Sequence, residues 1–176
     1  MGDLKIYNEY QKYGVHDYYK KFSKTYNNPH EERIRKVYLE HIGPLIAKDA
    51  KILDIATGSG LMCKLVNNYS GNYNIQGTDP YFSNKYCNMN LSFEDIAKGM
   101  LSMEYDMAIC CYAYHLMDES WRYDFLSNLS LSVKTFIIVS PSKKININHP
   151  MWSIVKSIRA DKVTLIVLEA TIGYKS

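Results

Sequence analysis

The stretch KILDIATGSGLMCKL, residues 51–65, decides the fold of this chain. An apolar segment, 51–56, leads into a turn of small residues and then into an amphipathic segment, 60–69. This pattern predicts a strand, a tight turn and a helix. A glycine-containing turn of this kind presents backbone N–H groups to a ligand beyond the carboxyl end of a strand. Such a turn can bind a dinucleotide, a phosphate or another nucleoside. It can also be a purely structural turn that binds no ligand.

The turn lacks the residues that phosphate-binding motifs require. A dinucleotide fingerprint needs G-x-G-x-x-G, but Cys63 stands where a third glycine would follow Gly58 and Gly60. A Walker A loop needs Lys and then Ser or Thr after its last glycine, and Leu61 follows Gly60 instead. Neither phosphate motif is therefore complete.

Acidic residues at the ends of the first two predicted strands favour a cationic nucleoside. Asp54 lies just before the turn, where its carboxylate would repel a pyrophosphate and attract an ammonium or sulfonium group. The second predicted strand, 73–79, ends at Asp79, where an acid can hold the hydroxyls of a ribose. Either acid alone is equally compatible with a turn former or a helix cap. Together with Gly58 and Gly60, they favour a functional site.

The rest of the chain alternates between strand and helix patterns. Strands are predicted at 51–56, 73–79, 103–115, 134–141 and 162–172, and helices at 60–69, 119–133 and 150–161, with 80–89 a loop or short helix. This alternation predicts an α/β fold with a mainly parallel central sheet flanked by helices. The first 48 residues are helical and aromatic in pattern. We therefore expect a single domain of 176 residues, with a helical arm or lid over 1–48 and an α/β core over 49–176.

Composition limits the classes of binding partner and the cellular compartment that we expect. The formal net charge is only +3 and Lys and Arg form no dense stripe, which does not favour a nucleic-acid partner. The start of the chain has no apolar signal segment, and no apolar run is long enough to span a bilayer. None of the four cysteines forms a C-x-x-C pair. We expect a cytoplasmic protein with free thiols, no membrane contact and no metal.

Four motifs in order resemble the class I S-adenosylmethionine-dependent methyltransferases. ILDIATGSG (52–60) is similar to the first motif, with Ala56 in the position of the first glycine, and GTDP (77–80) is similar to the second. LSFEDIAKG (91–99) resembles the third motif and YDMAICCYAYHLM (105–117) the fourth. The likeness covers about residues 50–142. It implies a Rossmann-like methyltransferase sandwich with S-adenosyl-L-methionine as cofactor and S-adenosyl-L-homocysteine (SAH) as product.

The resemblance also implies which residues contact the cofactor. It places Asp54 near the methionine amino group and Asp79 on the ribose. It places Asp95 and Ile96 on the adenine, and the two adjacent cysteines near the methionine moiety. The residues that it assigns to cofactor binding are Asp54, Ala56, Gly58, Gly60, Asp79, Pro80, Glu94, Asp95, Ile96, Cys110 and Cys111.

The arm carries the candidates for acceptor binding. YGVHDYYKKFSKTYNNPHE (13–31) and SPSKK (140–144) resemble a group of small stand-alone methyltransferases of uncharacterised substrate. We expect the arm to line the acceptor pocket, with His30 or His115 taking a proton and Tyr19 as a third catalytic candidate. The alternative is that the tyrosines only pack the arm onto the sheet and that Asn28 helps to start a helix. The substrate-binding candidates are Tyr18, Tyr19, Tyr26, Asn28, His30 and His115.

Three functions stay open at this point. The first is an S-adenosylmethionine-dependent methyltransferase whose acceptor is a small molecule or an exposed side chain. The second is a catalytically silent partner or activating subunit that binds the same cofactor. It is favoured because only one strand, 162–172, follows the last predicted helix, where the family has an antiparallel hairpin. The third is an RNA methyltransferase.

Overall fold

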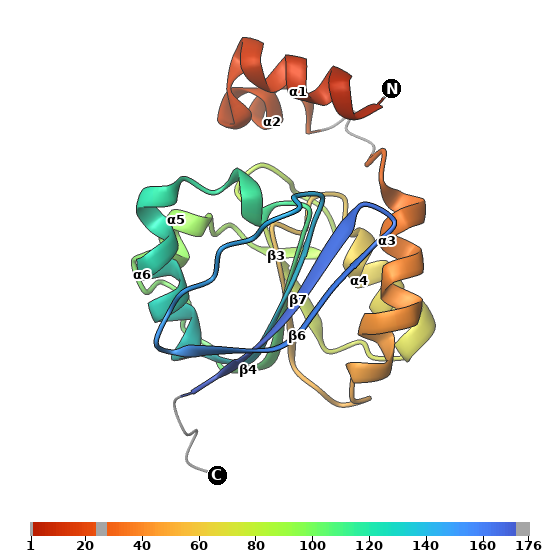
Figure 1. Cartoon of the computed structure of the whole chain (residues 1–176), viewed down its shortest axis with the longest axis vertical. Helices are drawn as coiled ribbons and strands as arrows, with labels where there is room; N and C mark the ends of the chain where they lie inside the picture. Colours follow the sequence, from red (N-terminus) through yellow and green to blue (C-terminus); the bar gives the residue numbers. More distant parts are fainter. Residues whose placement is uncertain (1, 24–27, 172–176) are drawn as a thin grey trace.

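A seven-stranded sheet forms the centre of the computed structural model, which describes residues 2–23 and 28–171 (Figure 1). The strand order is β3-β2-β1-β4-β5-β7-β6. The first five strands pair in parallel, whereas β7 runs antiparallel to both β5 and β6. The predicted α/β fold with a mainly parallel sheet is confirmed. The strands are β1 (Ile52–Ile55), β2 (Ile75–Thr78), β3 (Cys87–Met89), β4 (Tyr105–Cys111), β5 (Val133–Ser140), β6 (Trp152–Ala160) and β7 (Val163–Ala170).

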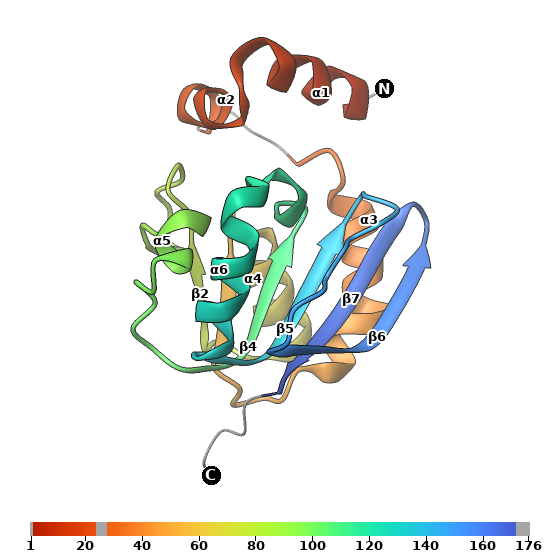
Figure 2. The ribbon, with the colours of Figure 1, turned by 60° about the vertical axis from the view of Figure 1, so that its left-hand side comes forward.

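Helices cover both faces of this sheet, and two more lie at its carboxyl edge. The α-helices are α1 (Gly2–Tyr13), α2 (Val15–Phe22), α3 (Glu31–Val37), α4 (Leu61–Leu65), α5 (Phe93–Ala97) and α6 (Glu119–Ser130). The π turns are η1 (Tyr38–Ile42) and η3 (Val66–Ser70), and the 3-10 turns are η2 (Gly43–Leu45) and η4 (Tyr114–Leu116). Helices α5 and α6 lie on one face and α3 and α4 on the other (Figure 2).

The central strands are apolar on both faces because each face has its own core. Along β1, Leu53 packs with the α5–α6 core, while Ile52 packs with the α3–α4 core. Along β5, Phe136 and Ile137 divide between the two cores in the same way. All four side chains are fully buried. This period of two is what a parallel sheet with two covered faces requires.

The register brings three strand ends together at one edge. Asp54 of β1 lies opposite Gly77 of β2 and Ile109 of β4. The carboxyl ends of these parallel strands therefore point the same way, toward α1 and α2, which lie above that edge (Figure 2). Ligands of open parallel sheets bind at this kind of edge.

The predicted helix at 150–161 is wrong, because Trp152–Ala160 forms β6. This strand pairs antiparallel with β7 through a two-residue turn in which Asp161 and Lys162 have φ of 48° and 66°. Left-handed values at both turn residues match the twist of a tight hairpin. Most of β6 is exposed or half-buried, so its apolar residues show no clear period. The antiparallel hairpin missing from the sequence-based expectation is therefore present.

Two smaller expectations also need correction. The segment 80–89, predicted as a loop or short helix, ends in the short strand β3, whose three residues are too few to show an alternating pattern. The helix predicted over 119–133 ends at Ser130, and Val133 already belongs to β5, where it is fully buried. Periodicity alone does not separate the end of a helix from the start of an apolar strand.

Candidate functional site

A cavity opens at the carboxyl ends of β1, β2 and β4 and is roofed by the arm. Its walls come from six segments of the chain. They are Val15 and Tyr19 of α2, Asn28 before α3 with Ile34 of α3, residues 54–59 with Leu61 and Met62, residues 79–82, residues 91–93, and residues 111–113 with Leu116.

The turn after β1 forms the floor of this cavity through alternating left-handed residues. Ala56, Gly58 and Gly60 have φ of 57°, 55° and 78°. A Cβ atom on Gly60 would lie 2.4 Å from Cδ2 of Tyr86, so this position needs glycine for space as well as for conformation. Ala56 and Gly58 line the cavity, whereas Gly60 does not. Two of the three left-handed residues of the turn therefore border the cavity.

Asp54 is a buried carboxylate that borders the cavity. Its side chain is 2% exposed. Its Oδ2 accepts hydrogen bonds from Oγ1 of Thr57 at 2.5 Å and from Sγ of Cys63 at 3.4 Å. Burial, with a smaller contribution from the Asp79 carboxylate, raises the pKa of Asp54 to about 7 against these two hydrogen bonds. A cationic group bound beside Asp54 would favour its ionised form.

Asp79 joins the turn after β1 to the turn after β2. Its Oδ2 accepts from the backbone N–H of Gly58 at 3.0 Å, and its Oδ1 accepts from that of Tyr81 at 2.8 Å. Burial raises the pKa of Asp79, and the backbone hydrogen bonds oppose that shift. Asp79 and Pro80 both line the cavity, at the end where Tyr81 and Phe82 also lie. Asp54 and Asp79 therefore face one space, as their positions at the strand ends predicted.

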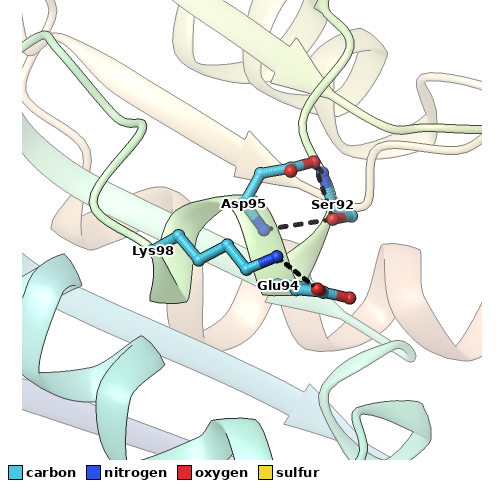
Figure 3. A network of polar contacts seen from close by, with 4 residues as sticks. All are labelled: Ser92, Glu94, Asp95 and Lys98. Atoms are coloured by element: carbon cyan, nitrogen blue, oxygen red, sulfur yellow. Dashed lines mark hydrogen bonds and ion pairs between the residues drawn. The ribbon is translucent and has the colours of Figure 1, made fainter.

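The third motif contributes to the cavity through other residues than those predicted. Asp95 closes a capping box at the start of α5: it accepts from the backbone N–H of Ser92 at 2.8 Å, and its own N–H donates to Oγ of Ser92 at 3.1 Å (Figure 3). Glu94 pairs with Lys98 on the exposed side of the same helix (Figure 3). Ile96 is fully buried in the α5–α6 core.

None of Glu94, Asp95 and Ile96 lines the cavity. Leu91, Ser92 and Phe93, the three residues before them, do so instead. The signal for this shift was available in the sequence, because a serine followed three residues later by an acid marks a helix start. An adenine contact of Asp95 and Ile96 stays a prediction.

The end of β4 places one of its two cysteines in the wall. Cys111 lines the cavity, whereas Cys110 points into the α5–α6 core and is fully buried. Burial raises the pKa of both thiols, so both are neutral near pH 7. Tyr112, which follows, has φ of 57° and lines the cavity with Ala113. Non-glycine residues with such backbone angles are uncommon and concentrate at functional sites.

The arm is tied to the core through aromatic contacts above Asp79. Tyr19 stacks on Tyr81 with ring centroids 5.9 Å apart and an interplanar angle of 16°. Nδ1 of His16 lies 2.9 Å from the hydroxyl of Tyr81. Tyr19 lines the cavity, whereas Tyr18 packs against Tyr10 within the arm. Tyr26 lies outside the described residues.

The two candidate histidines lie beside the cavity and do not line it. His30 stacks on Tyr112 with ring centroids 4.7 Å apart, and the backbone N–H of His30 donates to Oδ1 of Asn28, which does line the cavity. Burial, the Arg122 cation and His30 lower the pKa of His115 to about 4. His115 is therefore neutral near pH 7, and its buried Nδ1 has no hydrogen-bond partner among the described residues.

Residues 2–23 and 28–171 include no group of His, Cys, Asp and Glu side chains that could hold a metal ion. No helix there is long and apolar enough to cross a membrane.

No family model matches the chain. An uncharacterized protein of Schizosaccharomyces pombe is 27% identical over 187 residues, which cover 79% of this chain and 75% of that protein. This relative carries no functional description.

Solved structures show the fold. The magnesium protoporphyrin IX methyltransferase of Synechocystis PCC 6803 with bound S-adenosylmethionine superposes with a TM-score of 0.60, 11% identity, and coverage of 96% of this chain and 97% of that one. An O-methyltransferase family protein of Burkholderia thailandensis gives a TM-score of 0.63 at 10% identity over 92% of this chain and 60% of that one. The 16S rRNA methyltransferase RmtF with bound SAH gives a TM-score of 0.60 at 13% identity, over 80% of this chain and 64% of that one. The chain has the fold of the class I, Rossmann-like methyltransferases.

Proposed function

We propose that the protein is an S-adenosyl-L-methionine-dependent methyltransferase with SAH as its product. The observation that carries the proposal is the pair of buried carboxylates, Asp54 and Asp79, which border one cavity at the ends of β1 and β2. A cavity whose floor is a left-handed turn and whose acids lie at two strand ends suits a nucleoside with a cationic tail. The fold and the cofactors bound by its structural neighbours support the same ligand.

The cofactor would span the cavity from Asp79 to the end of β4. Asp79 and Pro80 would contact the ribose, and Phe93 with its two preceding residues would border the adenine. Asp54 would face the methionine amino group, beside Ala56, Gly58 and Cys111. The methyl group would then point toward the space between the arm and the end of β4.

Transfer of that methyl group is an in-line displacement with a neutral thioether as leaving group. The donor is already activated, so the enzyme mainly aligns the nucleophile with the methyl carbon and the sulfur. Alignment of this kind can lower the activation barrier by roughly 7–11 kcal/mol. This role falls to the residues of the arm and of the segment after β4 that line the cavity, above all Tyr19, Asn28 and Tyr112.

The acceptor we propose is a small molecule or a single exposed side chain, in the cytoplasm. The arm would act as a lid, since Val15 and Tyr19 of the arm line the same cavity as Asp54 and Gly58 of the core. No Lys, Arg or His is among the described residues that line it, which disfavours a phosphate-rich acceptor such as RNA. The RNA alternative predicts instead that RNA binding falls steeply with salt.

The test is titration calorimetry of the purified protein with S-adenosylmethionine and SAH, and with NAD as control. Binding of the first two at micromolar levels, without heat from NAD, is expected. Asp79→Ala should abolish that binding, because the ribose contact and the link between the two turns are lost together. Heat with NAD alone would refute the proposal.

A catalytically silent, cofactor-binding subunit is the second candidate. The expected absence of the antiparallel hairpin no longer favours this candidate, because β6 and β7 form that hairpin. A different observation now favours it: His115, the candidate proton acceptor, lies outside the cavity wall, and its pKa is lowered to about 4, which makes it a weak base. Incubating metabolite extract with labelled donor decides between the two. An enzyme labels a product more slowly after Tyr19→Phe or His115→Ala, whereas a silent subunit labels nothing.

A further inference from the structure

Two side chains to which the sequence patterns assigned no binding role donate hydrogen bonds to one oxygen of Asp54. Oγ1 of Thr57 and Sγ of Cys63 both donate to Oδ2, at 2.5 Å and 3.4 Å, and lie 3.6 Å from each other. We call these three residues the Asp54 clasp. It joins the end of β1, the turn that follows and the first turn of α4. All three residues are buried.

The orientation of Thr57 is fixed by its surroundings. Its N–H donates to the carbonyl of Thr78 at 3.1 Å, and its own carbonyl accepts from Gly60 at 2.9 Å. Its methyl carbon packs against Gly77, since a Cβ atom there would lie 2.7 Å from Cγ2 of Thr57. With the methyl held against the backbone of β2, the hydroxyl is directed at Asp54. Threonine therefore fits this position through both branches of its side chain.

Within residues 2–23 and 28–171, no cation is among the titratable groups that act on Asp54. The titratable groups that act on it or feel its charge are acids and thiols from every adjoining element: Cys63 of α4, Asp79 after β2, Cys87 of β3, and Cys110 and Cys111 of β4. A buried carboxylate among such groups favours its protonated form. Consistent with this, its pKa is raised to about 7.

We propose that Thr57 and Cys63 are positioning residues that hold one oxygen of Asp54, so that cofactor binding exchanges the Asp54 proton for the ammonium group of the cofactor. The inference rests on the proposed function. In the exchange the O–H bond of Asp54 breaks and its proton leaves to solvent. The ionised carboxylate, still held by the clasp, then pairs with the ammonium group.

The exchange makes affinity depend on pH in a definite direction. SAH carries the ammonium group, whereas methylthioadenosine keeps the nucleoside and the sulfur but has no ammonium or carboxylate. Below pH 7, the affinity for SAH is expected to fall by about tenfold for each pH unit, with up to one proton released per ligand bound. The affinity for methylthioadenosine is expected to stay constant. Calorimetry between about pH 5 and pH 8, in two buffers of different ionisation enthalpy, measures both quantities.

Variants of the clasp test its members separately. Thr57→Val removes the hydroxyl and keeps the shape, so the midpoint of the SAH curve should move up by about one pH unit or more. Thr57→Ser, which keeps the hydroxyl, should keep the midpoint. Cys63→Ala should cause a smaller upward shift. Cys87→Ala, a matched thiol without a hydrogen bond to Asp54, should cause none.

The results of these experiments distinguish failure of the clasp from failure of the proposed function. An SAH affinity that does not vary with pH, or a midpoint that Thr57→Val leaves in place, overturns the clasp while the proposed function stands. The same pH dependence for methylthioadenosine also overturns it, because that ligand has no charge to exchange. Failure of the native protein to bind SAH at any pH overturns the proposed function and, with it, the clasp.

Discussion

Replacing Gly60 by alanine is expected to damage the site through its contact with Tyr86. Gly60 has φ of 78°, and an added Cβ would lie 2.4, 2.7 and 2.8 Å from Cδ2, Cγ and Cβ of Tyr86. Two of these atoms are close to the backbone of Tyr86, so a rotation of the ring cannot relieve the overlap. The segment between Asp79 and Tyr86 must then move, and this segment carries the cavity wall at Tyr81 and Phe82.

Gly71→Ala is the matched control, because it isolates the cost of a left-handed conformation from the cost of a steric overlap. Gly71 has φ of 61° and nothing within 4 Å of an added Cβ. The left-handed conformation costs a residue with a Cβ about 1–2 kcal/mol, and the loss of unfolded-state freedom offsets about 0.4–1 kcal/mol of that. Gly71→Ala should therefore lower the free energy of unfolding by roughly 1 kcal/mol. Overpacking adds about 1–3 kcal/mol, so Gly60→Ala should lower it by roughly 2–4 kcal/mol.

Urea unfolding of the two variants measures the difference, and calorimetry with SAH measures its effect on the site. We expect a gap in unfolding free energy of about 1–3 kcal/mol and an affinity loss of about tenfold or more in Gly60→Ala alone. Equal stability losses would mean that the Tyr86 overlap costs nothing. An unchanged affinity of Gly60→Ala for SAH would refute the link between this turn and the cavity.

Three further substitutions test other parts of the structure. Asp95→Ala removes the capping box and should lower the free energy of unfolding by about 1 kcal/mol in urea without changing SAH affinity, whereas a fall in affinity would support an adenine contact. Tyr81→Phe removes the hydroxyl that contacts His16, so trypsin should cleave α2 faster while the melting temperature stays constant; an unchanged cleavage rate would contradict this tie. Phe125→Ala should lower the free energy of unfolding by about 3–5 kcal/mol, because its ring is fully buried, and a loss below 1 kcal/mol would contradict that packing.

The parts of the fold that were predicted are those whose pattern is set locally. β1, β4 and β5 are short apolar runs because both of their faces are covered, and such runs are visible in the sequence. β6 was missed because its identity depends on β7, which lies beyond the turn at Asp161 and Lys162. Because most of β6 is exposed or half-buried, its apolar residues do not alternate, and only its pairing with β7 makes it a strand.

The same distinction explains which site residues were predicted. Asp54 and Asp79 could be placed from sequence because each ends a strand, and parallel strand ends meet at one edge. The roof and the far wall could not be placed in this way. Val15 reaches the cavity from the arm and Phe93 from the start of α5, and neither contact leaves a periodic signal. Asp95 shows the converse, since its local capping signal was readable and pointed away from the cavity.

Replacing Asp54 is expected to change the stability of the fold and the affinity for the cofactor in opposite directions. Its pKa rises from 3.8 to about 7 in the folded protein. Such a group contributes stability that is fully present below its unfolded pKa and is lost as pH rises through about 7, on the order of 4 kcal/mol. Asp54→Asn should therefore raise the free energy of unfolding in urea at pH 8 and weaken SAH binding at the same pH. Lower stability with unchanged affinity would instead make Asp54 a structural residue.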